Sequence, residues 1–227
     1  MRVWPASRGG RFRLLALILL VAVAGWIERG PCYEFVSRLP AISHYFGYSP
    51  QEGDIVFQSL PHGDLVDAIE GITHSPYSHC GVVLQNEKHD WVVIEAIGNV
   101  HETPLLLWEA RGRNGAFTAY RLDAKYEPMI PKFKDALLSR LGLPYDFNYD
   151  ISNQNGAYCS SLIWLSFEQV TAEKMGNLEK LRDLDWKPFE AFIETEQGGG
   201  LPLDRVMITP ASLARATQLH EVYRGGM

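Results

Sequence analysis

The sequence lacks several features that would assign it to a specialised class of protein. It has three cysteines in 227 residues, and it contains no C-x-x-C or H-E-x-x-H spacing, the patterns typical of zinc sites. Basic residues are not in excess, since the net charge is −6, and no basic stripe carries interleaved aromatic residues. We therefore expect no metal ion, no other cofactor and no nucleic-acid partner.

Six side chains are nevertheless of the types that bind zinc. They are His62, His74, His79, Cys80, His89 and His101. His79 and Cys80 are adjacent in a predicted strand, so their side chains point to opposite faces of it. No pair in this set has the spacing of a zinc motif, and a metal site is therefore the less favoured interpretation.

The composition is typical of a globular protein with a sizeable core. Hydrophobic residues make up 46% of the chain and charged residues 21%, and there is no internal repeat and no long low-complexity run. A chain of this length corresponds to one domain with elaborations. We predict a signal peptide or N-terminal membrane anchor over residues 1–26, a proline-containing lead-in over 27–52 and one domain over 53–227.

An apolar run at residues 14–26 follows four arginines near the N-terminus, Arg2, Arg8, Arg11 and Arg13. A basic segment followed by an apolar segment of this length is typical of a secretory signal. The run is shorter than the roughly 20 residues of a spanning helix, and Ala22-Val23-Ala24 offers a small-x-small cleavage site. We expect an exported protein of the periplasm or cell envelope. The alternative is an uncleaved segment that associates with the inner membrane as an anchor.

Export has a consequence for the three cysteines. An oxidising compartment favours disulfides, and an odd number of cysteines leaves at least one thiol free. A disulfide between Cys32 and Cys80 would leave Cys159 free, although the sequence alone does not establish this pairing.

Cys159 lies where a helix is expected to begin. Flexible residues 152–156 lead into an apolar helical pattern from residue 158 to about residue 170. Unpaired N–H groups and the positive end of the helix dipole at this position favour a thiolate and can hold an oxyanion. Two interpretations are open, a catalytic nucleophile or an ordinary buried cysteine.

Two strand-like runs, residues 78–84 and 91–96, flank a polar turn and predict a β-hairpin. With Leu84 facing Asp90, His79 lies directly opposite Glu95, so an imidazole and a carboxylate meet on one face. Cys80 falls on the other face, away from this pair, and we expect it to be dispensable for chemistry. A slip of one residue would send His79 and Glu95 to opposite faces. The alternatives are a hydrogen-bonded sheet histidine and an edge-strand carboxylate facing solvent.

The remaining elements follow from periodicity and from the positions of proline and glycine. We predict strands at residues 55–58, 100–104, 117–122 and 206–208. We predict helices from Asp64, over 131–141 and over 209–216, with a helical tendency at 178–184.

Several segments resemble a known family. They are GDIVFQ at 53–58, THSPYSH at 73–79, IEA at 94–96, LGLPYDF at 141–147, YCS at 158–160, LPL at 201–203 and TP at 209–210. In this order they resemble the YiiX/YebB-like permuted NlpC-type papain-like cysteine hydrolases (amidases). The resemblance spans about residues 53–215, and several motifs in series make it specific. Ordinary papain-like enzymes have the cysteine helix before the histidine strand, whereas here His79 and Glu95 precede Cys159, as in the permuted branch.

The resemblance implies a fold and a set of catalytic residues. The implied fold is α+β, a circularly permuted papain-like (NlpC-type) fold in which an antiparallel barrel-like sheet packs on the nucleophile helix. The implied roles are nucleophile for Cys159, base for His79 and orientation of the base for Glu95. Ser161 departs from the pattern, because many relatives have an acidic residue two positions after the cysteine. This departure bears on a substrate contact rather than on the nucleophile.

Tyr145 and Tyr158 are candidates for substrate binding. They would line the cleft or donate to an oxyanion, or else pack in an aromatic core. The sequence thus predicts a cysteine hydrolase that acts on a peptide or cell-wall-like amide bond through an acyl-enzyme at Cys159. The alternatives are a lipid or acyl-ester hydrolase or acyltransferase using the same site, and a non-catalytic envelope binding module. The expected partner is a small peptide or acyl substrate.

Overall fold

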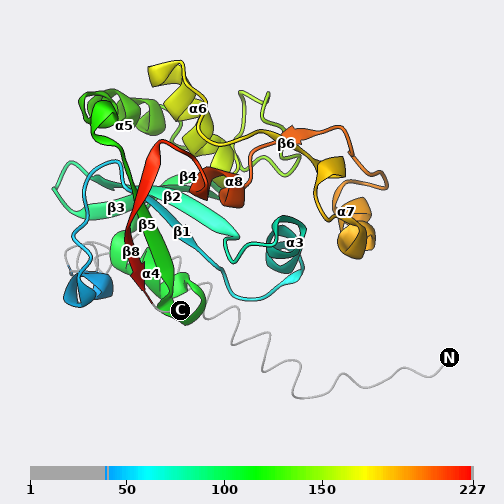
Figure 1. Cartoon of the computed structure of the whole chain (residues 1–227), viewed down its shortest axis with the longest axis horizontal. Helices are drawn as coiled ribbons and strands as arrows, with labels where there is room; N and C mark the ends of the chain where they lie inside the picture. The colour runs from blue at the N-terminus through cyan, green and yellow to red at the C-terminus, as the bar shows by residue number, and fades with distance from the viewer. Residues whose placement is uncertain (1–38, 40, 226–227) are drawn as a thin grey trace.

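One six-stranded antiparallel sheet organises the computed structural model, which describes residue 39 and residues 41–225 (Figure 1). Its strands run in the order β4-β3-β2-β1-β5-β8. Their bounds are β1 Ile55–Gln58, β2 His79–Gln85, β3 Trp91–Ile97, β4 Asn99–Pro104, β5 Phe117–Leu122 and β8 Leu219–Gly225. The first four strands follow one another along the chain, whereas β8 comes from the C-terminal end to pair with β5.

Helices cover both faces of this sheet. α5 (Ile130–Leu138) and α6 (Cys159–Thr171) pack on one face, and α4 (Leu105–Arg111) packs on the other (Figure 1). The other helices are α3 Asp64–Thr73, α7 Glu190–Glu196 and α8 Pro210–Ala214. A two-stranded sheet, β6 Glu179–Lys180 with β7 Val206–Met207, and 3-10 turns at Ile42–Phe46, Arg113–Gly115, Ala124–Met129, Leu181–Asp183 and Lys187–Phe189 complete the described elements.

The strand residues alternate between two hydrophobic cores, because successive side chains of a strand point to opposite faces. Val82 and Leu84 belong to the larger core, which includes Phe167 of α6. Val83 belongs to the smaller core, which includes Trp108 of α4. Both faces are therefore covered, and β2 is buried along nearly its whole length.

The sheet is open, which corrects the expected barrel-like closure, while the α+β class and the antiparallel pairing are confirmed. β4 and β8 are its two edges, and the described residues contain no pairing between them. The loop before α6 covers the outer edge of β4 instead. The Val100 N–H donates to the Leu143 carbonyl, and the Gly142 N–H donates to the Val100 carbonyl, both at 2.8 Å. This loop satisfies backbone groups that a neighbouring strand would otherwise pair.

The β2–β3 hairpin differs from its expected register by two residues. Leu84 pairs with Val92 rather than with Asp90. The cause is the turn, in which the Asn86 side-chain oxygen accepts from the N–H groups of Lys88 and Asp90 at 2.9 and 3.0 Å. The loop therefore begins one residue later than predicted. A shift of two residues leaves each side chain on its predicted face, so His79 and Glu95 still share one face of the sheet.

Most other predicted elements are present, two of the strands with the predicted ends and the rest with shifted ones. The strands predicted at 55–58 and 117–122 are β1 and β5, and the predicted cysteine helix is α6. α5 ends at Leu138, three residues before the predicted end. The helical tendency at 178–184 is wrong, because β6 pairs with β7 there and a 3-10 turn follows. A tertiary pairing has overridden local propensity.

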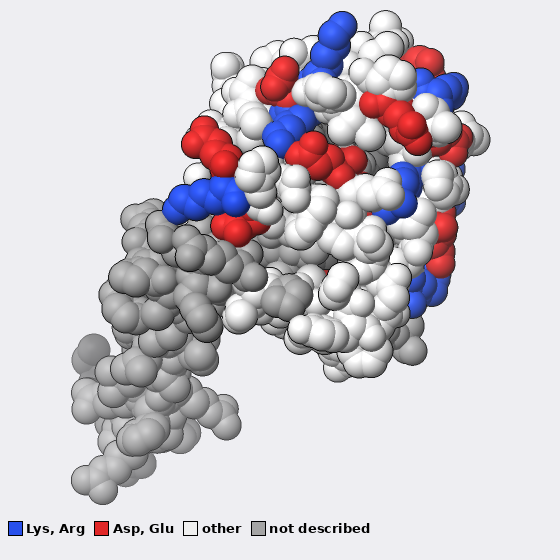
Figure 2. Space-filling model, turned by 90° about the vertical axis from the view of Figure 1, so that its left-hand side faces the viewer, with Lys and Arg blue, Asp and Glu red and all other residues white. Residues whose placement is uncertain are grey.

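Charged side chains are mixed rather than segregated on the face drawn in Figure 2, where Lys and Arg lie beside Asp and Glu. Ion pairs within the described residues include Lys134–Glu52 at 2.6 Å and Arg121–Asp54 at 2.7 Å. Charge on that face does not by itself indicate a polyanionic partner.

Several predictions concern residues outside the described part of the chain. The signal peptide or anchor at 1–26, its cleavage after Ala24 and the thiol of Cys32 all lie there. Of the lead-in at 27–52, the described residues form the 3-10 turn Ile42–Phe46 and bury Tyr48 in the smaller core. Within residues 41–225, no helix is long and apolar enough to cross a membrane.

Candidate active site

Cys159 is the first residue of α6, at the helix start that the sequence predicts. The N–H of Tyr158 donates to Ser161 Oγ at 2.9 Å, and this hydroxyl donates to the Tyr158 carbonyl at 3.0 Å. Ser161 is buried and therefore acts as a helix cap, a position in which a carboxylate can accept the same N–H.

The Cys159 sulfur lies in a site that favours its ionised form. The residue is only 4% exposed. Hydrogen bonds from Cys80 and His79 and the positive charge of His79 hold the pKa of the Cys159 thiol well below its ordinary value, although burial opposes this. The unpaired N–H groups at the start of α6 add to this effect. Cys159 thus has the surroundings of a nucleophile.

His79 is the first residue of β2, and its ring is almost fully buried beside Trp108, with ring centroids 6.4 Å apart. Burial alone would lower the pKa of His79. Hydrogen bonds to Cys159 and Glu95 outweigh it and raise this pKa to about 9. Near neutral pH, the proton of the Cys159–His79 pair therefore lies on the imidazole.

Glu95 binds the other side of the imidazole, as the sequence predicts. Its Oε2 lies 2.5 Å from His79 Nε2. The two residues are diagonal rather than directly opposite, because the hairpin register is shifted. Gly81 leaves room for the contact between His79 and Glu95. A Cβ at position 81 would lie 2.4 Å from Val93 Cγ1 and 3.4 Å from the Glu95 Cβ.

Arg111 and Thr103 complete the surroundings of Glu95, and sequence reasoning does not identify either. Arg111 Nη2 donates to Glu95 Oε2, and Thr103 Oγ1 donates to Oε1 at 2.6 Å. Burial would raise the pKa of Glu95, but His79 and Arg111 hold it well below its usual range. Thr103 carried a weak signal, as a polar residue within a predicted strand. Arg111 carried none, because it comes from α4, whose docking is a long-range event.

Cys80 faces away from His79, as predicted, but it does not lie away from the site. Its side chain enters the larger core, on the side of the sheet where α6 packs, and it is the first cause of the lowered pKa of the Cys159 thiol. His79 and Cys80 are the first two residues of β2, and both lower the pKa of the thiol at the start of α6. That Cys80 is dispensable for chemistry stays a prediction.

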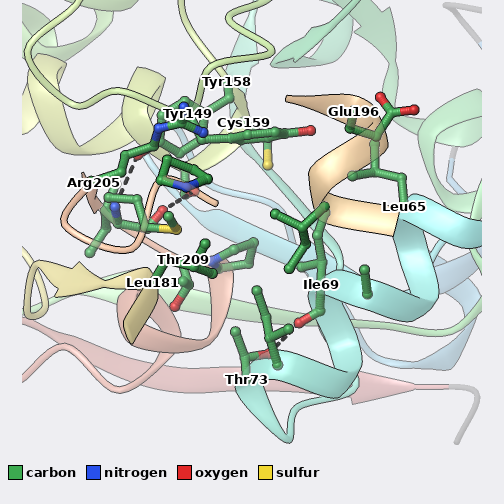
Figure 3. Close-up of a pocket in the computed structure, with 18 of the residues that line it drawn as sticks. Leu65, Ile69, Thr73, Tyr149, Tyr158, Cys159, Leu181, Glu196, Arg205 and Thr209 are labelled. Carbon is green, nitrogen blue, oxygen red and sulfur yellow. Dashed lines mark hydrogen bonds between the residues drawn. The ribbon is translucent and has the colours of Figure 1, made fainter. Parts of the chain in front are cut away.

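The two predicted tyrosines both line the pocket beside Cys159 and differ in the use of their hydroxyls. The Tyr158 hydroxyl accepts the Ile208 N–H at 2.9 Å, which fixes the segment before α8. The Tyr145 ring lies beside that of Tyr149, with centroids 6.1 Å apart, and burial followed by the negative charge of Cys159 raises the pKa of Tyr145. Tyr149, which sequence reasoning missed, lies near Tyr158 and Cys159 in Figure 3.

The pocket next to Cys159 has mainly apolar walls. Leu65 and Ile69 of α3 face Cys159 across it (Figure 3), and Ile193 of α7 adds to this wall. Arg205 and Gln197 also line it and are joined by a hydrogen bond of 2.5 Å. The pocket therefore brings hydrocarbon surface to the nucleophile and offers few polar groups.

Two known proteins are similar to this chain over most of its length. The YiiX protein of Escherichia coli (strain K12), described as uncharacterised, is 31% identical over 180 residues, which are 78% of this chain and 88% of that protein. The crystal structure of the metalloprotein YiiX from Escherichia coli O157:H7 superimposes with a TM-score of 0.73 at 30% identity. It covers 78% of this chain and 99% of that one.

Between residues 41 and 225, no group of three or more His, Cys, Asp or Glu side chains could hold a metal ion. The described residues around Cys159 therefore do not fit a metal centre built from three or more such side chains.

The sequence model of the permuted papain-like amidase enzymes, the YaeF/YiiX, C92 family, matches residues 49–223. This span contains the whole sheet up to β8 and all the residues around Cys159 described above. The chain therefore belongs to the permuted papain-like amidase family of YaeF and YiiX.

Proposed function

We propose that the protein is a cysteine hydrolase that cleaves an amide bond, with Cys159 as nucleophile, His79 as base and Glu95 as the residue that orients the base. The observation that carries the proposal is the buried His79–Glu95 pair, whose imidazole also helps to lower the pKa of Cys159 at the start of α6. Membership of an amidase family supports the same class of reaction.

In the first half of the proposed reaction, the Cys159 thiolate attacks the carbonyl carbon of the amide and a tetrahedral oxyanion forms. The Cys159 N–H at the helix start and the Tyr145–Tyr149 hydroxyl pair would donate hydrogen bonds to this oxyanion. His79 gives its proton to the leaving nitrogen, the C–N bond breaks and the amine departs. A thioester of the acyl group with Cys159 remains.

In the second half, a water molecule attacks the thioester while His79 accepts one of its protons. The C–S bond breaks, the acid is released and the thiolate–imidazolium pair is restored. Glu95 keeps a negative charge beside the imidazole throughout, and Arg111 and Thr103 hold it in place. This arrangement fixes the ring so that its other nitrogen faces Cys159.

A second candidate is the hydrolysis or transfer of a lipid or acyl ester at the same site. The observation that favours it is the apolar wall of Leu65, Ile69 and Ile193 beside Cys159. An alkyl chain in this pocket would gain about 0.8 kcal/mol for each methylene that it buries. The same thioester would form, and an alcohol rather than an amine would leave.

The full-length chain and its Cys159→Ala variant can be incubated with three model substrates, a short peptide amide, an N-acyl amine with a long alkyl chain and the matching acyl ester. We expect turnover of an amide and a mass gain on Cys159 equal to the acyl group, both absent from the variant. Turnover of the ester alone would replace the amidase proposal by the second candidate. An absence of turnover and adduct, with ordinary thiol reactivity, would instead support a non-catalytic envelope binding module.

We also propose that the protein acts outside the cytoplasm, at the cell envelope. The arginines before residue 14 and the apolar run at 14–26 support this location. Residues 1–40 fused to a reporter that works only outside the cytoplasm should give a signal, and a silent reporter would refute the proposal. N-terminal sequencing would then separate cleavage after Ala24 from retention of the anchor.

A further inference from the structure

Large apolar side chains stand out of the first described turn, the 3-10 turn Ile42–Phe46. Ile42 is 54% exposed, and Tyr45 and Phe46 are each 74% exposed. Leu39 precedes them and is also exposed. These four residues, here called the N-terminal patch, are four of the seven exposed large apolar residues in the described part of the chain. Apolar exposure is therefore concentrated at this one turn.

The turn is fixed to the body of the protein, so the patch faces outward in the folded molecule. Ser43 is buried, its N–H donates to Glu109 Oε2 at 3.3 Å, and its hydroxyl donates to Glu109 Oε1. Beyond the turn, the buried Tyr48 hydroxyl donates to Asp54 Oδ2 at 3.0 Å. The first residues of a domain are poorly ordered unless they are tied down, and these contacts tie the turn down on both sides.

The surface on this side of the molecule carries few charges near the turn. The turn is the blue segment at the left of Figure 1, and Figure 2 looks at that side. Below the middle of the face in Figure 2, the described surface shows few charged side chains except at its right-hand edge. The chain has a net charge of −6, so attraction to an anionic surface does not explain the patch. Its contacts must be apolar.

The chain that precedes the patch determines which partner lies within reach. The apolar run at 14–26 ends 13 residues before Leu39. An extended chain of that length spans at most roughly 45 Å, so a bilayer that holds the run stays close to the turn. Tyrosine is enriched at the headgroup level of membranes, because its ring is apolar and its hydroxyl is polar. A patch of aromatic and aliphatic side chains without lysine or arginine fits such an interface.

We propose that the N-terminal patch docks the folded domain on the surface of a phospholipid bilayer, with Tyr45 and Phe46 inserted at the level of the headgroups. The turn is then a second point of attachment beside the apolar run, and it fixes the orientation of the domain. The inference rests on the proposed location only in that a bilayer must be near the turn, and it does not depend on the amidase reaction.

Docking in this way has a consequence for access to the pocket beside Cys159. α3 and α7, which form a wall of the pocket, lie at the right-hand end of the described structure in Figure 1, whereas the turn lies at the left-hand end. The pocket therefore faces away from the bilayer that the patch contacts. A substrate reaches Cys159 from the aqueous side, which favours a soluble amide over a lipid of the same bilayer.

The test uses the full-length chain in phosphatidylcholine vesicles whose acyl chains carry bromine just below the headgroups. A bimane dye is attached to Tyr45→Cys in a background with Cys32→Ser and Cys159→Ala, in which Cys80 remains fully buried. Phe147→Cys, labelled in the same background, is the matched control. Phe147 is also an exposed aromatic residue, but its ring lies 4.8 Å from that of Tyr145, which lines the pocket.

Bromine quenches the dye only at close range. We expect the brominated lipid to remove most of the fluorescence at position 45 and almost none at position 147. High salt should leave this result unchanged, because the contact is apolar. Adding Ile42→Ser and Phe46→Ser should restore most of the fluorescence at position 45. Both residues are exposed, so these changes should not impair folding.

Equal quenching at the two positions, or none at position 45, would overturn the inference. It would also be overturned if the dye at position 45 were shielded from aqueous iodide without being quenched by bromine. The run at 14–26 or a second copy of the chain would then cover the patch. The measurement needs neither turnover nor export, so failure of the amidase or location proposals would leave its result intact.

Discussion

Arg111 donates a hydrogen bond to Glu95 Oε2, the same carboxylate oxygen that lies 2.5 Å from His79 Nε2. One fully buried oxygen thus serves two positively charged groups. Burial favours the neutral acid, but His79 and Arg111 keep the pKa of Glu95 well below its usual range. The charge that orients the imidazole therefore depends partly on a side chain from α4, on the opposite face of the sheet from α6.

Replacing Arg111 by methionine should destabilise the protein and weaken the thiolate. Removal of one partner from a buried ion pair costs about 3 kcal/mol, because the remaining charge is left uncompensated. Urea denaturation measures this loss, and iodoacetamide labelling of Cys159 at pH 7 should slow. Arg113→Met is a matched control, since Arg113 is similarly exposed and pairs with Glu70, 3.1 Å away. The control should lose stability at unchanged labelling, and slowing in both variants would contradict the assignment.

The acidity of Cys159 should depend on His79. Iodoacetamide should label Cys159 well below pH 8.5, the ordinary pKa of a thiol, and His79→Ala should move the profile to higher pH. Mass spectrometry of the intact protein gives the rate at each pH. His101→Ala is the control, because His101 Nε2 is 3.8 Å from Glu95 Oε1 and outside the Cys159–His79 contact. A free-thiol profile that His79→Ala leaves unchanged would refute the catalytic assignment.

The same pair makes a specific prediction about stability and pH. The raised pKa of His79, about 9, contributes stability that is complete below the unfolded pKa of about 6.5 and lost as pH rises through 9. The lowered pKa of Cys159 contributes stability that is present above about 8.5 and lost as pH falls. Between these values the pair holds one proton in both states, on Cys159 when unfolded and on His79 when folded, so the two effects cancel.

Cys159→Ala removes the contribution of the thiol to this pH dependence of stability. We expect the free energy of unfolding of the variant, measured in urea, to fall relative to the unaltered protein as pH rises above about 6.5, because Glu95 still raises the pKa of His79 and no thiol offsets the loss of its proton. The fall should end below pH 9, since the contribution of Cys159 to the raised pKa of His79 is gone. Parallel curves for the two proteins would show that the proton does not move from Cys159 to His79 on folding.

Tyr158 and Tyr145 should respond differently to loss of their hydroxyls. Tyr158→Phe leaves the buried Ile208 N–H without its partner, which costs about 1–3 kcal/mol in unfolding free energy and should change kcat little. Tyr145→Phe removes a hydroxyl near Cys159 and should lower kcat at nearly unchanged stability. Thermal denaturation and turnover of both variants test the pair, and equal effects on kcat would contradict the division of roles.

The sequence identifies the parts of this site that depend on local patterns. The start of α6 follows from the apolar periodicity after residue 158, and the shared face of His79 and Glu95 follows from strand alternation. The exact pairing does not, because the Asn86 side chain moves the start of the turn by one residue. A shift of the pairing by two residues keeps each side chain on its face of the sheet. The contact between His79 and Glu95 is therefore predicted correctly although the predicted register is wrong.

What the sequence does not reveal comes from packing between distant elements. Arg111 reaches Glu95 only because α4 docks on the sheet, and Cys80 shares a buried core with Cys159 only because α6 packs on that face. The open sheet has a similar origin, since the loop around Leu143 covers β4 where a barrel would have placed another strand. None of these contacts follows from a periodic pattern in the sequence.

The order of the elements along the chain has a consequence for how reactivity arises during folding. His79 and Glu95 belong to one hairpin, so their contact closes a short loop, whereas α6 enters the site from a much later part of the sequence. Local hairpins form before distant segments dock. Cys159 should therefore have the reactivity of an ordinary thiol as long as the chain is unfolded. Its nucleophilic form appears only when α6 docks against a hairpin that is already complete.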